Sequence, residues 1–520
     1  MRLVLDKKFF KYYVALFIAV AVNLFLFSST SPIHSILNLQ YDEVTYNLMG
    51  KGIKYGRIPY IDLSDHKGIY LYIVYALANI ISETNHIGMF VVSVFIFYAI
   101  ALFAFKISYL LLKRCNIFDD SKNIILSFLC SFIIYFISNT YYFSFGGLDC
   151  ETVISPLLLF AYYQMLKYIL NEDNKHSIKY IFIDGILAGI ILYVKANALI
   201  CLLPIAVFLL IDLIIKKEYK CLLLNALFGF LGVVVGILPG TIYLIATGSF
   251  KAMVDEYFLV NMLYVNAGLP SETSKLNSFY QCIDEFKEYM FITIISPALL
   301  YTILRNYKKI VTVRIVIFST FTLIFAWTAI LMPLRSYSHY LDLVTFNIFI
   351  FVFFILVNVF KLLSSRKTLI VFTSFAFIIV NVLSYGLNLE ISNINGFIQH
   401  KLSKEAINIY SKYDYESPKL LVVGNEPILY EAFNVLPSNK VFIIPVVNRK
   451  DYSKPYDELL QHIEKHNEEY IILSFSRYLK TDKEYLQMVY GALANNYENI
   501  GSVKFHTNEL ELFIRSEQDG

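Results

Sequence analysis

The sequence predicts a polytopic α-helical membrane protein that carries a small α/β domain after its last membrane-spanning helix. Hydrophobic residues make up 57% of the 520 residues, which is more than a water-soluble domain can bury. Apolar runs of about 18 residues or more recur as far as residue 387, and each is long enough to cross a bilayer. Beyond that point the apolar runs shorten and alternate with amphipathic segments, a pattern typical of an α/β domain.

The lengths of the apolar runs predict about 11 membrane-spanning helices. The predicted spans cover residues 12–29, 87–112, 123–143, 152–170, 179–194, 197–215, 221–246, 286–304, 311–334, 338–362 and 367–387. The first span follows several basic residues and lacks a small-residue cleavage site, so we interpret it as an uncleaved anchor. The run 69–82 is too short to cross, and we expect an interfacial or re-entrant helix there.

Basic residues in alternate loops predict the orientation of the chain. Lys and Arg recur in the loops near 113–122, 175–179, 216–220, 305–309 and 361–367. Positively charged loops remain in the cytoplasm, so we expect a cytoplasmic N-terminus. The loops 30–86, 144–151, 195–196, 247–285 and 335–337 then face outward, together with the C-terminal tail.

Three regions follow from this reading of the sequence. Residues 1–387 form the membrane domain, whose outer loop 30–86 carries interfacial helices, residues 388–410 form a connector, and residues 411–520 form an extracytoplasmic α/β domain. In the last region KLLVVG, KVFIIPVV and EEYIILSFS are expected to be buried strands, and VKFHTNELELFI a hairpin. YDELLQHIEKHN and DKEYLQMVYGALANNY are expected to be helices.

Charge and cysteine content exclude other classes of protein. The net charge of +3 is too small to indicate a nucleic-acid partner. The six cysteines are scattered rather than spaced as a disulfide framework, although a bridge between Cys150 and Cys282 on the predicted outer side stays open. Gly424–Asn425–Glu426–Pro427 lacks the glycine spacing of a dinucleotide-binding site.

Polar and charged side chains gather at the predicted outer ends of the spans. They are Asp42, Glu43, Asp62, Asp65, His66, Lys67, Asp149, Glu151, Lys195, Arg335, His339 and Tyr340. Each alone is also explained as a solvated anchor at headgroup level, because charge at a membrane boundary is costly unless it is solvated, paired or used. Together they suit a reaction that needs a base and a held phosphate: a carboxylate takes a proton from a hydroxyl, and Lys or Arg neutralises a phosphate.

The stretch 41–72 resembles the first outer loop of GT-C membrane glycosyltransferases. The nearest branch is family 39-like and holds protein O-mannosyltransferases and lipid A aminoarabinose transferases. The features that carry the resemblance are Asp42–Glu43 after the first helix, TYNLMGKGIKYG, RIPYIDLSDHKG and the tyrosine-rich IYLYIVYAL. SYSHYLDLVTF at 336–346 is similar to the His-Tyr pair that precedes a late helix in the family, and FLVNMLYVN at 258–266 resembles another outer loop more weakly.

One position departs from the family pattern. Asp65–His66–Lys67–Gly68 is similar to the Asp-His-Lys-Gly-Pro stretch of many bacterial members, but Ile69 stands where those proteins have proline. The departure concerns the shape of the loop rather than its chemistry.

The resemblance implies an inverting sugar transfer from a polyprenyl-phosphate donor to an acceptor hydroxyl, at the outer face of the bacterial cytoplasmic membrane. Asp42 matches the general base of the family, with Glu43 as the alternative. Lys67 matches a lysine that contacts the donor phosphate. Asp149 matches an acidic residue that orients the loop or a substrate. The late loop with Arg335, His339 and Tyr340 matches a segment near the same phosphate.

Further assignments complete the predicted site. From topology we add Lys195 to the donor-phosphate ligands. The predicted substrate-binding residues besides Asp149 are Asp62, Asp65, His66 and Glu151. No cofactor and no metal ligand is predicted, although the Asp-x-x-Asp spacing of Asp62 and Asp65 beside His66 leaves a divalent cation as an alternative. The expected partners are the lipid-linked donor, a lipid, glycan or protein acceptor, and membrane lipid, with no nucleic acid.

Functions from other classes stay open. A transporter or flippase would carry buried charge and broken helices near the bilayer midplane, whereas the ionisable residues here crowd the ends of the spans. A polysaccharide polymerase or ligase shares the many-span plan but would more typically have a large arginine-rich late outer loop. A non-catalytic assembly subunit would retain the acids without using them.

Overall fold

The chain folds into two compact units in a computed structural model. Unit 1 comprises Met1–Ser31, Phe90–Ile242 and Glu272–Glu390. Unit 2 comprises Pro32–Met89, Tyr243–Ser271 and Ile391–Gly520. The structure describes residues 9–144, 147–171, 176–266, 272–363, 366–413, 419–444, 447–465, 468–475, 482–505 and 508–516.

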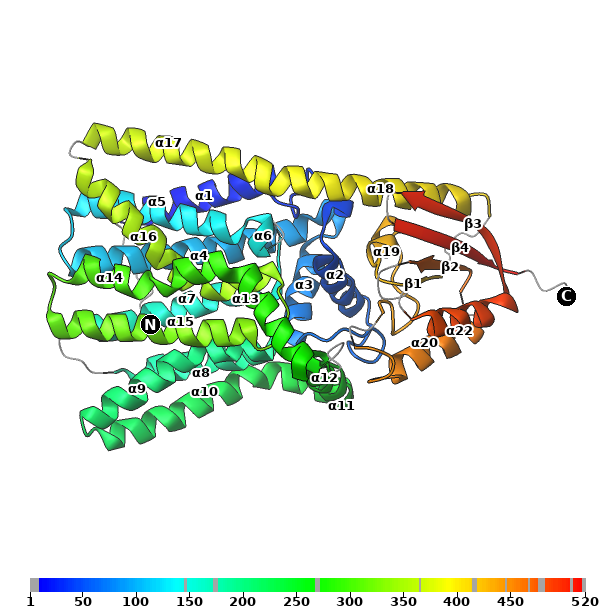
Figure 1. Ribbon diagram of the computed structural model, residues 1–520, viewed down its shortest axis with the longest axis horizontal. Coiled ribbons are helices and arrows are strands. Elements are labelled where there is room, and N and C mark those ends of the chain that lie inside the picture. Colours follow the sequence, from blue (N-terminus) through cyan, green and yellow to red (C-terminus); the bar gives the residue numbers. More distant parts are fainter. Residues whose placement is uncertain are drawn as a thin grey trace. The chain divides into compact units, whose positions relative to one another are not determined.

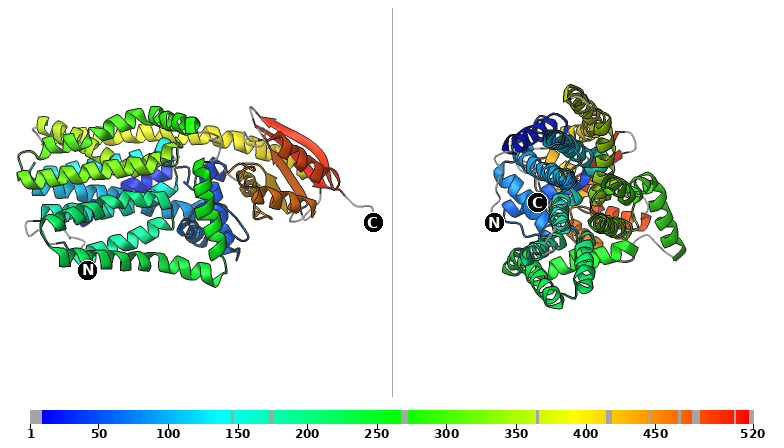
Figure 2. Two further views of the ribbon diagram at one scale, coloured as in Figure 1. Left: turned by 60° about the horizontal axis from the view of Figure 1, so that its bottom comes forward. Right: turned by 90° about the vertical axis from the view of Figure 1, so that its left-hand side faces the viewer.

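Unit 1 is a bundle of long helices, seen from the side in Figure 1 and nearly end-on in the right-hand view of Figure 2. Its elements, in whole or in part, are α1 (Phe10–Phe27), α4 (Ile87–Arg114), α5 (Asp120–Ser138), α6 (Tyr141–Ser144), α7 (Cys150–Leu170), α8 (Ile178–Leu192), η3 (Ala196–Leu202), α9 (Leu203–Ile215), α10 (Tyr219–Ala246), α13 (Glu272–Ile294), α14 (Ser296–Leu304), α15 (Lys309–Leu331), η5 (Ser338–Val344), α16 (Thr345–Leu362), α17 (Arg366–Ser384) and η6 (Tyr385–Glu390).

Ten helices among the described residues are long and apolar enough to cross a membrane, as expected of a multi-pass membrane protein. The predicted span 179–194 is not among them, because α8 has only 15 residues. Such a helix extends about 22 Å, less than the roughly 30 Å of a bilayer core. Lys195, which follows α8, nevertheless pairs with Glu151 in the first turn of α7. The short helix therefore returns the chain to the end of the bundle at which α7 begins.

Glycines let α8 and α10 approach closely. A Cβ atom on Gly185 would lie 2.2 Å from the carbonyl oxygen of Gly229, and one on Gly189 would lie 2.8 Å from the Cα of Gly236. From the other side, a Cβ on Gly232 would lie 2.2 Å from a carbonyl oxygen of α8. Small residues at such a crossing replace side-chain contacts with backbone contacts, which is a common way to join helices in a membrane.

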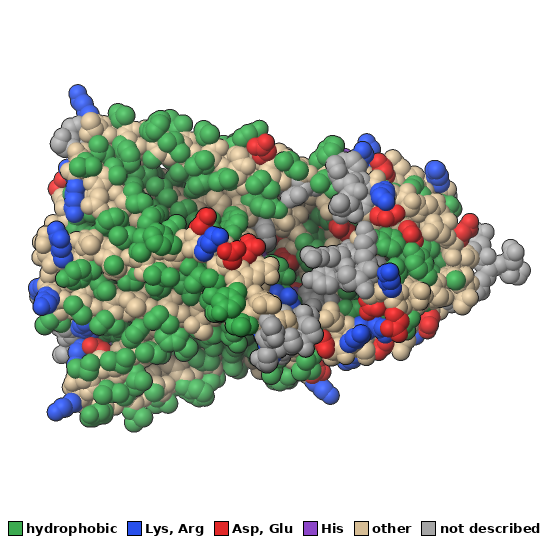
Figure 3. Space-filling model, in the orientation of Figure 1, with side chains coloured by type: hydrophobic (Ala, Val, Ile, Leu, Met, Phe, Trp, Pro, Cys, Tyr) green, Lys and Arg blue, Asp and Glu red, His purple; other side chains and the backbone are tan. Residues whose placement is uncertain are grey.

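The outer surface of the bundle is apolar along its sides and basic at one end. Figure 3 shows hydrophobic side chains over the flanks of the helices and Lys and Arg side chains at the left-hand end. The turns between α4 and α5, between α9 and α10 and between α14 and α15 lie at that end in Figure 1. These three loops are among the basic loops that predict the topology. The side of the membrane that they face stays a prediction.

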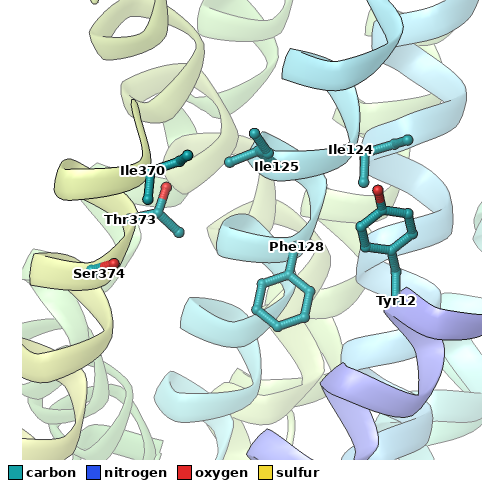
Figure 4. A pocket seen from close by; sticks show the side chains of 7 residues that line it. All are labelled: Tyr12, Ile124, Ile125, Phe128, Ile370, Thr373 and Ser374. Carbon is teal, nitrogen blue, oxygen red and sulfur yellow. The ribbon is translucent and has the colours of Figure 1, made fainter. Parts of the chain in front are cut away.

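An apolar groove of about 270 Å³ runs between α1, α5 and α17 (Figure 4). The residues that line it are Tyr12, Ile124, Ile125, Phe128, Ile370, Thr373 and Ser374. All three helices are candidate membrane spans, so this groove lies on an apolar flank of unit 1 and carries no charged side chain.

Unit 2 gathers three stretches that are far apart in the sequence. Its elements are η1 (Ile36–Asn38), α2 (Tyr41–Lys54), α3 (Ile69–Ile81), η2 (Thr84–His86), α11 (Phe250–Met253), η4 (Val254–Leu259), α12 (Val260–Asn266), α18 (Ile391–Tyr410), β1 (Leu420–Val423), α19 (Ile428–Ala432), α20 (Lys454–Glu464), β2 (Tyr470–Ser474), α22 (Lys483–Ala494), β3 (Tyr497–Phe505) and β4 (Asn508–Arg515). The predicted connector 388–410 is mostly the helix α18.

The predicted small α/β fold is confirmed by a four-stranded sheet in the order β1-β2-β4-β3. β1 pairs with β2 in parallel, whereas β4 is antiparallel to both of its neighbours. Leu421, Ile471 and Phe513 point to one face and join the core with α20 and α22. On the other face, Tyr410 of α18 stacks on Tyr470 with ring centroids 4.0 Å apart. Figure 1 shows the helices on the two sides of the sheet.

One predicted strand is wrong. Lys440–Ile444 of KVFIIPVV forms no strand, and residues 445–446 lie outside the described part of the chain. Val441, Phe442 and Ile444 are buried all the same. The backbone of this segment makes hydrogen bonds outside a strand ladder; for example, the Ile444 amide donates to the Gly424 carbonyl at 3.1 Å. The predicted hairpin is present as β3 and β4, and its turn at 506–507 lies outside the described residues.

The predicted outer loop 30–86 contains two helices that join the C-terminal region within unit 2. α2 and α3 pack so closely that a Cβ on Gly50 would lie 2.5 Å from the backbone of Tyr75. Asn47 and Lys51 of α2 donate to the two carboxylate oxygens of Glu431 in α19, at 2.8 and 2.5 Å. Glu431 is buried, so these bonds fasten α19 to α2.

All six cysteines are free thiols. Cys150 lies at the start of α7 and Cys282 lies in α13, and both are buried. The bridge that the sequence left open between them does not form.

Candidate functional site

The predicted site residues are shared between the two units. Unit 2 holds Asp42, Glu43, Asp62, Asp65, His66 and Lys67. Unit 1 holds Asp149, Glu151, Lys195, Arg335, His339 and Tyr340. The pocket that the sequence predicts for both groups together stays a prediction.

Asp42 and Glu43 form the acidic first turn of α2, which begins at Tyr41. Carboxylates are favoured there because the helix dipole and the unbonded amides at a helix N-terminus attract negative charge. Glu43 is 2% exposed, whereas Asp42 is only partly buried. Of the two, Asp42 is therefore the carboxylate that a bound molecule can reach more easily.

Asp62 has a structural partner. Its Oδ2 atom accepts a hydrogen bond from the Ile58 amide at 2.7 Å. This bond closes the turn that brings the chain to Asp65, and Tyr60 within the turn has a positive φ of 68°. No group of side chains with metal-ligand spacing among the described residues contains Asp62, Asp65 or His66, so the Asp-x-x-Asp spacing gains no geometric support as a cation site.

Asp65, His66 and Lys67 form a hydrogen-bonded chain. His66 Nδ1 lies 3.0 Å from Asp65 Oδ1, and His66 Nε2 lies 2.7 Å from Lys67 Nζ. The Tyr72 hydroxyl donates to Asp65 Oδ2 at 2.9 Å. Lys67 Nζ also lies 5.9 Å from the centre of the Tyr46 ring, within the range of a cation–π contact.

The backbone under this chain is fixed by side chains. The Lys67 amide donates to the Tyr72 hydroxyl at 3.0 Å, and the Lys67 carbonyl accepts from the Tyr60 hydroxyl at 2.8 Å. The His66 carbonyl accepts from Asn261 Nδ2 at 2.7 Å. Asn261 belongs to α12, in the segment FLVNMLYVN, so two sequence-distant stretches of unit 2 meet here.

Burial and neighbouring charge set the protonation states of this chain. Burial opposes ionisation of Asp65, but the neighbouring His66 and Lys67 outweigh it and hold the pKa of Asp65 well below its usual range. Burial and the Lys67 ammonium lower the pKa of His66, although Asp65 and Asp42 act in the opposite direction. Near neutral pH we therefore expect an ionised Asp65 and a neutral His66.

The influence of Asp42 on His66 places the candidate base near the candidate phosphate ligand. The charge of Asp42 partly offsets the lowering of the His66 pKa, so Asp42 lies within range of a charge interaction with that imidazole. Lys67 is hydrogen-bonded to that same imidazole ring. Asp42 and Lys67 therefore both act on the charge state of one histidine, within one unit.

The unit 1 group is built on the start of α7. Asp149 is the N-cap of α7, and its Oδ1 atom accepts from the Cys150 amide at 2.7 Å. Glu151, which is fully buried, forms an ion pair with Lys195 beyond α8. Burial would lower the pKa of Lys195, but the Glu151 carboxylate outweighs it and raises that pKa. Lys195 thus remains charged, with a carboxylate as its partner.

The late loop completes this group. His339 Nδ1 lies 3.5 Å from Asp149 Oδ2, and Lys195 Nζ lies 3.9 Å from the centre of the Tyr340 ring. Arg335 is partly buried in the segment between α15 and η5. The structure thus brings five of the predicted residues together in one cluster: Asp149, Glu151, Lys195, His339 and Tyr340.

Sequence reasoning missed several polar partners. Asp342 is 1% exposed and accepts from the Thr152 hydroxyl at 2.9 Å. An acid inside the apolar run 338–362 was the available signal for Asp342. Tyr72 and Asn261 had no signal, because tyrosine and asparagine are common throughout this chain.

No protein-family model matches the chain, and no curated protein is similar to it in sequence.

Proposed function

We propose that the protein is a membrane glycosyltransferase that moves a sugar from a polyprenyl-phosphate donor to an acceptor hydroxyl at the outer face of a bacterial cytoplasmic membrane. The observation that supports the proposal is the hydrogen bond between Lys67 and His66 within unit 2, together with the carboxylate of Asp42 in the same unit, whose charge also acts on His66. A carboxylate and an ammonium that both act on one imidazole suit a displacement that needs a base for the attacking hydroxyl and a cation for the leaving phosphate.

The reaction balances as one displacement. Asp42 accepts the proton of the acceptor hydroxyl, and the oxygen forms a bond to the anomeric carbon of the donor sugar. The bond from that carbon to the phosphate oxygen breaks, and polyprenyl phosphate leaves with the electron pair. Lys67 offsets the charge that develops on the phosphate. A single in-line displacement inverts the anomeric configuration.

For the unit 1 group we keep separate proposals, taken from the resemblance and from the contacts within that unit. Asp149 is proposed to orient a substrate, as the resemblance implies, and His339 lies 3.5 Å from its carboxylate. Lys195 already neutralises Glu151, so we expect it to hold the cluster together more than to bind phosphate. Arg335 and Tyr340 remain candidate ligands of the donor.

The test uses the full-length protein in proteoliposomes with a panel of radiolabelled undecaprenyl-phosphate sugars and an envelope extract as acceptor source. The expected result is conversion of one donor to undecaprenyl phosphate and a labelled product. Asp42→Asn should lower the rate by about 10²–10⁴-fold, the range for loss of a general base. The matched control is Asp284→Asn, because Asp284 is an exposed aspartate of α13 that is 77% accessible.

Two outcomes would overturn the proposal. One is full sugar transfer by Asp42→Asn, which would show that Asp42 is no base. The other is movement of the intact donor across the vesicle membrane with no release of undecaprenyl phosphate from any member of the panel, which would favour a flippase.

A further inference from the structure

We propose that His66 is a positioning residue, whose ring, oriented by Asp65, holds the Lys67 ammonium where the phosphate of the donor binds. This inference rests on the proposed function, since it gives Lys67 a phosphate to bind. His66 itself need not touch the substrate.

The direction of each hydrogen bond supports the proposal. Asp65 is a carboxylate and can only accept, so the ring proton of His66 is on Nδ1, 3.0 Å from Asp65 Oδ1. The other ring nitrogen, Nε2, is then an acceptor, and Lys67 Nζ donates to it at 2.7 Å. The Tyr72 hydroxyl donates to Asp65 Oδ2 and fixes the carboxylate. All three donors thus point along one chain toward Asp65.

A hydrogen-bond partner such as His66 restricts a flexible lysine side chain before the phosphate binds. Lysine is among the side chains that lose most rotamer freedom when they are fixed, and an unrestrained lysine would lose that freedom at the moment of phosphate binding. The bond to His66 fixes the ammonium beforehand and uses one of its three protons. A phosphate would then meet a pre-oriented charge.

Only neutral His66 can accept this bond. Among the described residues, the charged and titratable groups that act on or contact its ring include Asp65, Lys67, Asp42 and Tyr264, whose ring centroid lies 5.9 Å from that of His66. A second proton on the ring would occupy Nε2 and face the ammonium of Lys67. Burial and Lys67 lower the pKa of His66, so the neutral form prevails near pH 7, and acidification through that pKa would release Lys67.

The experiment measures binding of undecaprenyl phosphate to the full-length protein in mixed micelles, with undecaprenol as the uncharged control. His66→Phe keeps a ring without nitrogen atoms, and we expect it to weaken binding of the phosphate about tenfold, the effect of one hydrogen bond to a charged group. His66→Gln offers an amide oxygen near the position of Nε2, and we expect it to restore most of the affinity. Lys67→Gln should weaken binding at least as much as His66→Phe.

Coupling and pH separate positioning from a merely structural role. Combining His66→Phe with Lys67→Gln should weaken binding no further than Lys67→Gln alone, because His66 acts through Lys67. The affinity of the wild type for undecaprenyl phosphate should fall more steeply on acidification than the affinity of His66→Gln. Protonation of the phosphate itself affects both proteins equally, so the difference between the two pH profiles reports the titration of His66. Additive losses, or the same pH profile in both proteins, would overturn the inference.

The failure of this inference is distinct from the failure of the proposed function. If Lys67→Gln binds undecaprenyl phosphate as the wild type does, the assignment of Lys67 to the donor phosphate is wrong. If Lys67→Gln loses affinity while His66→Phe does not, the role of Lys67 stands and only the positioning role of His66 is refuted.

Discussion

Replacing Lys195 by methionine should destabilise unit 1 strongly. Among the described residues, Glu151 forms its ion pair with Lys195, and the Glu151 side chain is 0% exposed. Removing one partner of a buried pair leaves an uncompensated charge and costs about 3–5 kcal/mol. Coulomb's law agrees with this range, since two unit charges about 4 Å apart attract by about 4 kcal/mol at an effective dielectric constant of 20.

The sole tryptophan of the chain provides the assay. Trp327 lies in α15 of unit 1, is buried, and donates from its indole nitrogen to the Thr293 hydroxyl at 2.9 Å. Its fluorescence, excited where tyrosine does not absorb, follows the unfolding of unit 1 in mixed micelles as the fraction of denaturing detergent rises. The free energy of unfolding of Lys195→Met should fall by the amount given above.

Two further variants test the reason for the loss. Adding Glu151→Gln to Lys195→Met removes the buried charge, so the double variant should recover most of the lost stability. Lys287→Met is the matched control, because Lys287 pairs with Asp284 at the surface with both side chains more than half exposed, and exposed pairs contribute little. The reasoning is refuted if Lys195→Met and Lys287→Met unfold alike, or if the double variant is no more stable than Lys195→Met.

Other features of the two units make separate predictions. In α10, Gly232→Ala should destabilise unit 1 by several kcal/mol, as overpacking does. Gly229→Ala should be tolerated, because the nearest contact of the added Cβ would be 3.4 Å away. Unfolding followed by Trp327 fluorescence compares the stabilities of the two variants. Burial raises the pKa of Glu426 from 4.5 to about 7. Protonation of Glu426 therefore stabilises the folded state, and this contribution is fully present below pH 4.5. Calorimetry should show that the free energy of unfolding falls as the pH rises through 7. Glu426→Gln should not show this fall. Lys51→Met should expose α19 to hydrogen exchange, because it leaves the buried Glu431 without its cation.

The long helices were predictable because a bilayer imposes a length on every apolar run. The same rule placed a full span at 179–194, where the structure has the 15-residue α8. Run length does not report close packing, and the glycine contacts between α8 and α10 depend on partners far along the chain. The strand predicted at KVFIIPVV was wrong for a different reason: a short apolar run is compatible with a strand or with any other buried segment.

The members of the site were easier to predict than their contacts. Charged residues at the ends of apolar runs are visible in the sequence, and Asp42, His66 and Lys67 were named for that reason. The pairing of Glu151 with Lys195 spans 44 residues and the bond from Thr152 to Asp342 spans 190. Nothing in the order of residues indicates such partners. The sequence therefore predicted Lys195 as a ligand of the donor phosphate, whereas in the structure Lys195 forms an ion pair with the carboxylate of Glu151.

The bond between α2 and α19 has a consequence for how the protein is made. Lys51 and Glu431 are 380 residues apart in the chain, and ribosomes add roughly 5–20 residues per second. Helix α2 thus waits roughly 20–80 seconds for its partner to be synthesised. During that interval α2 would be without the contact that fastens it, which makes nascent, unfinished chains the form most open to chaperones and proteases outside the membrane.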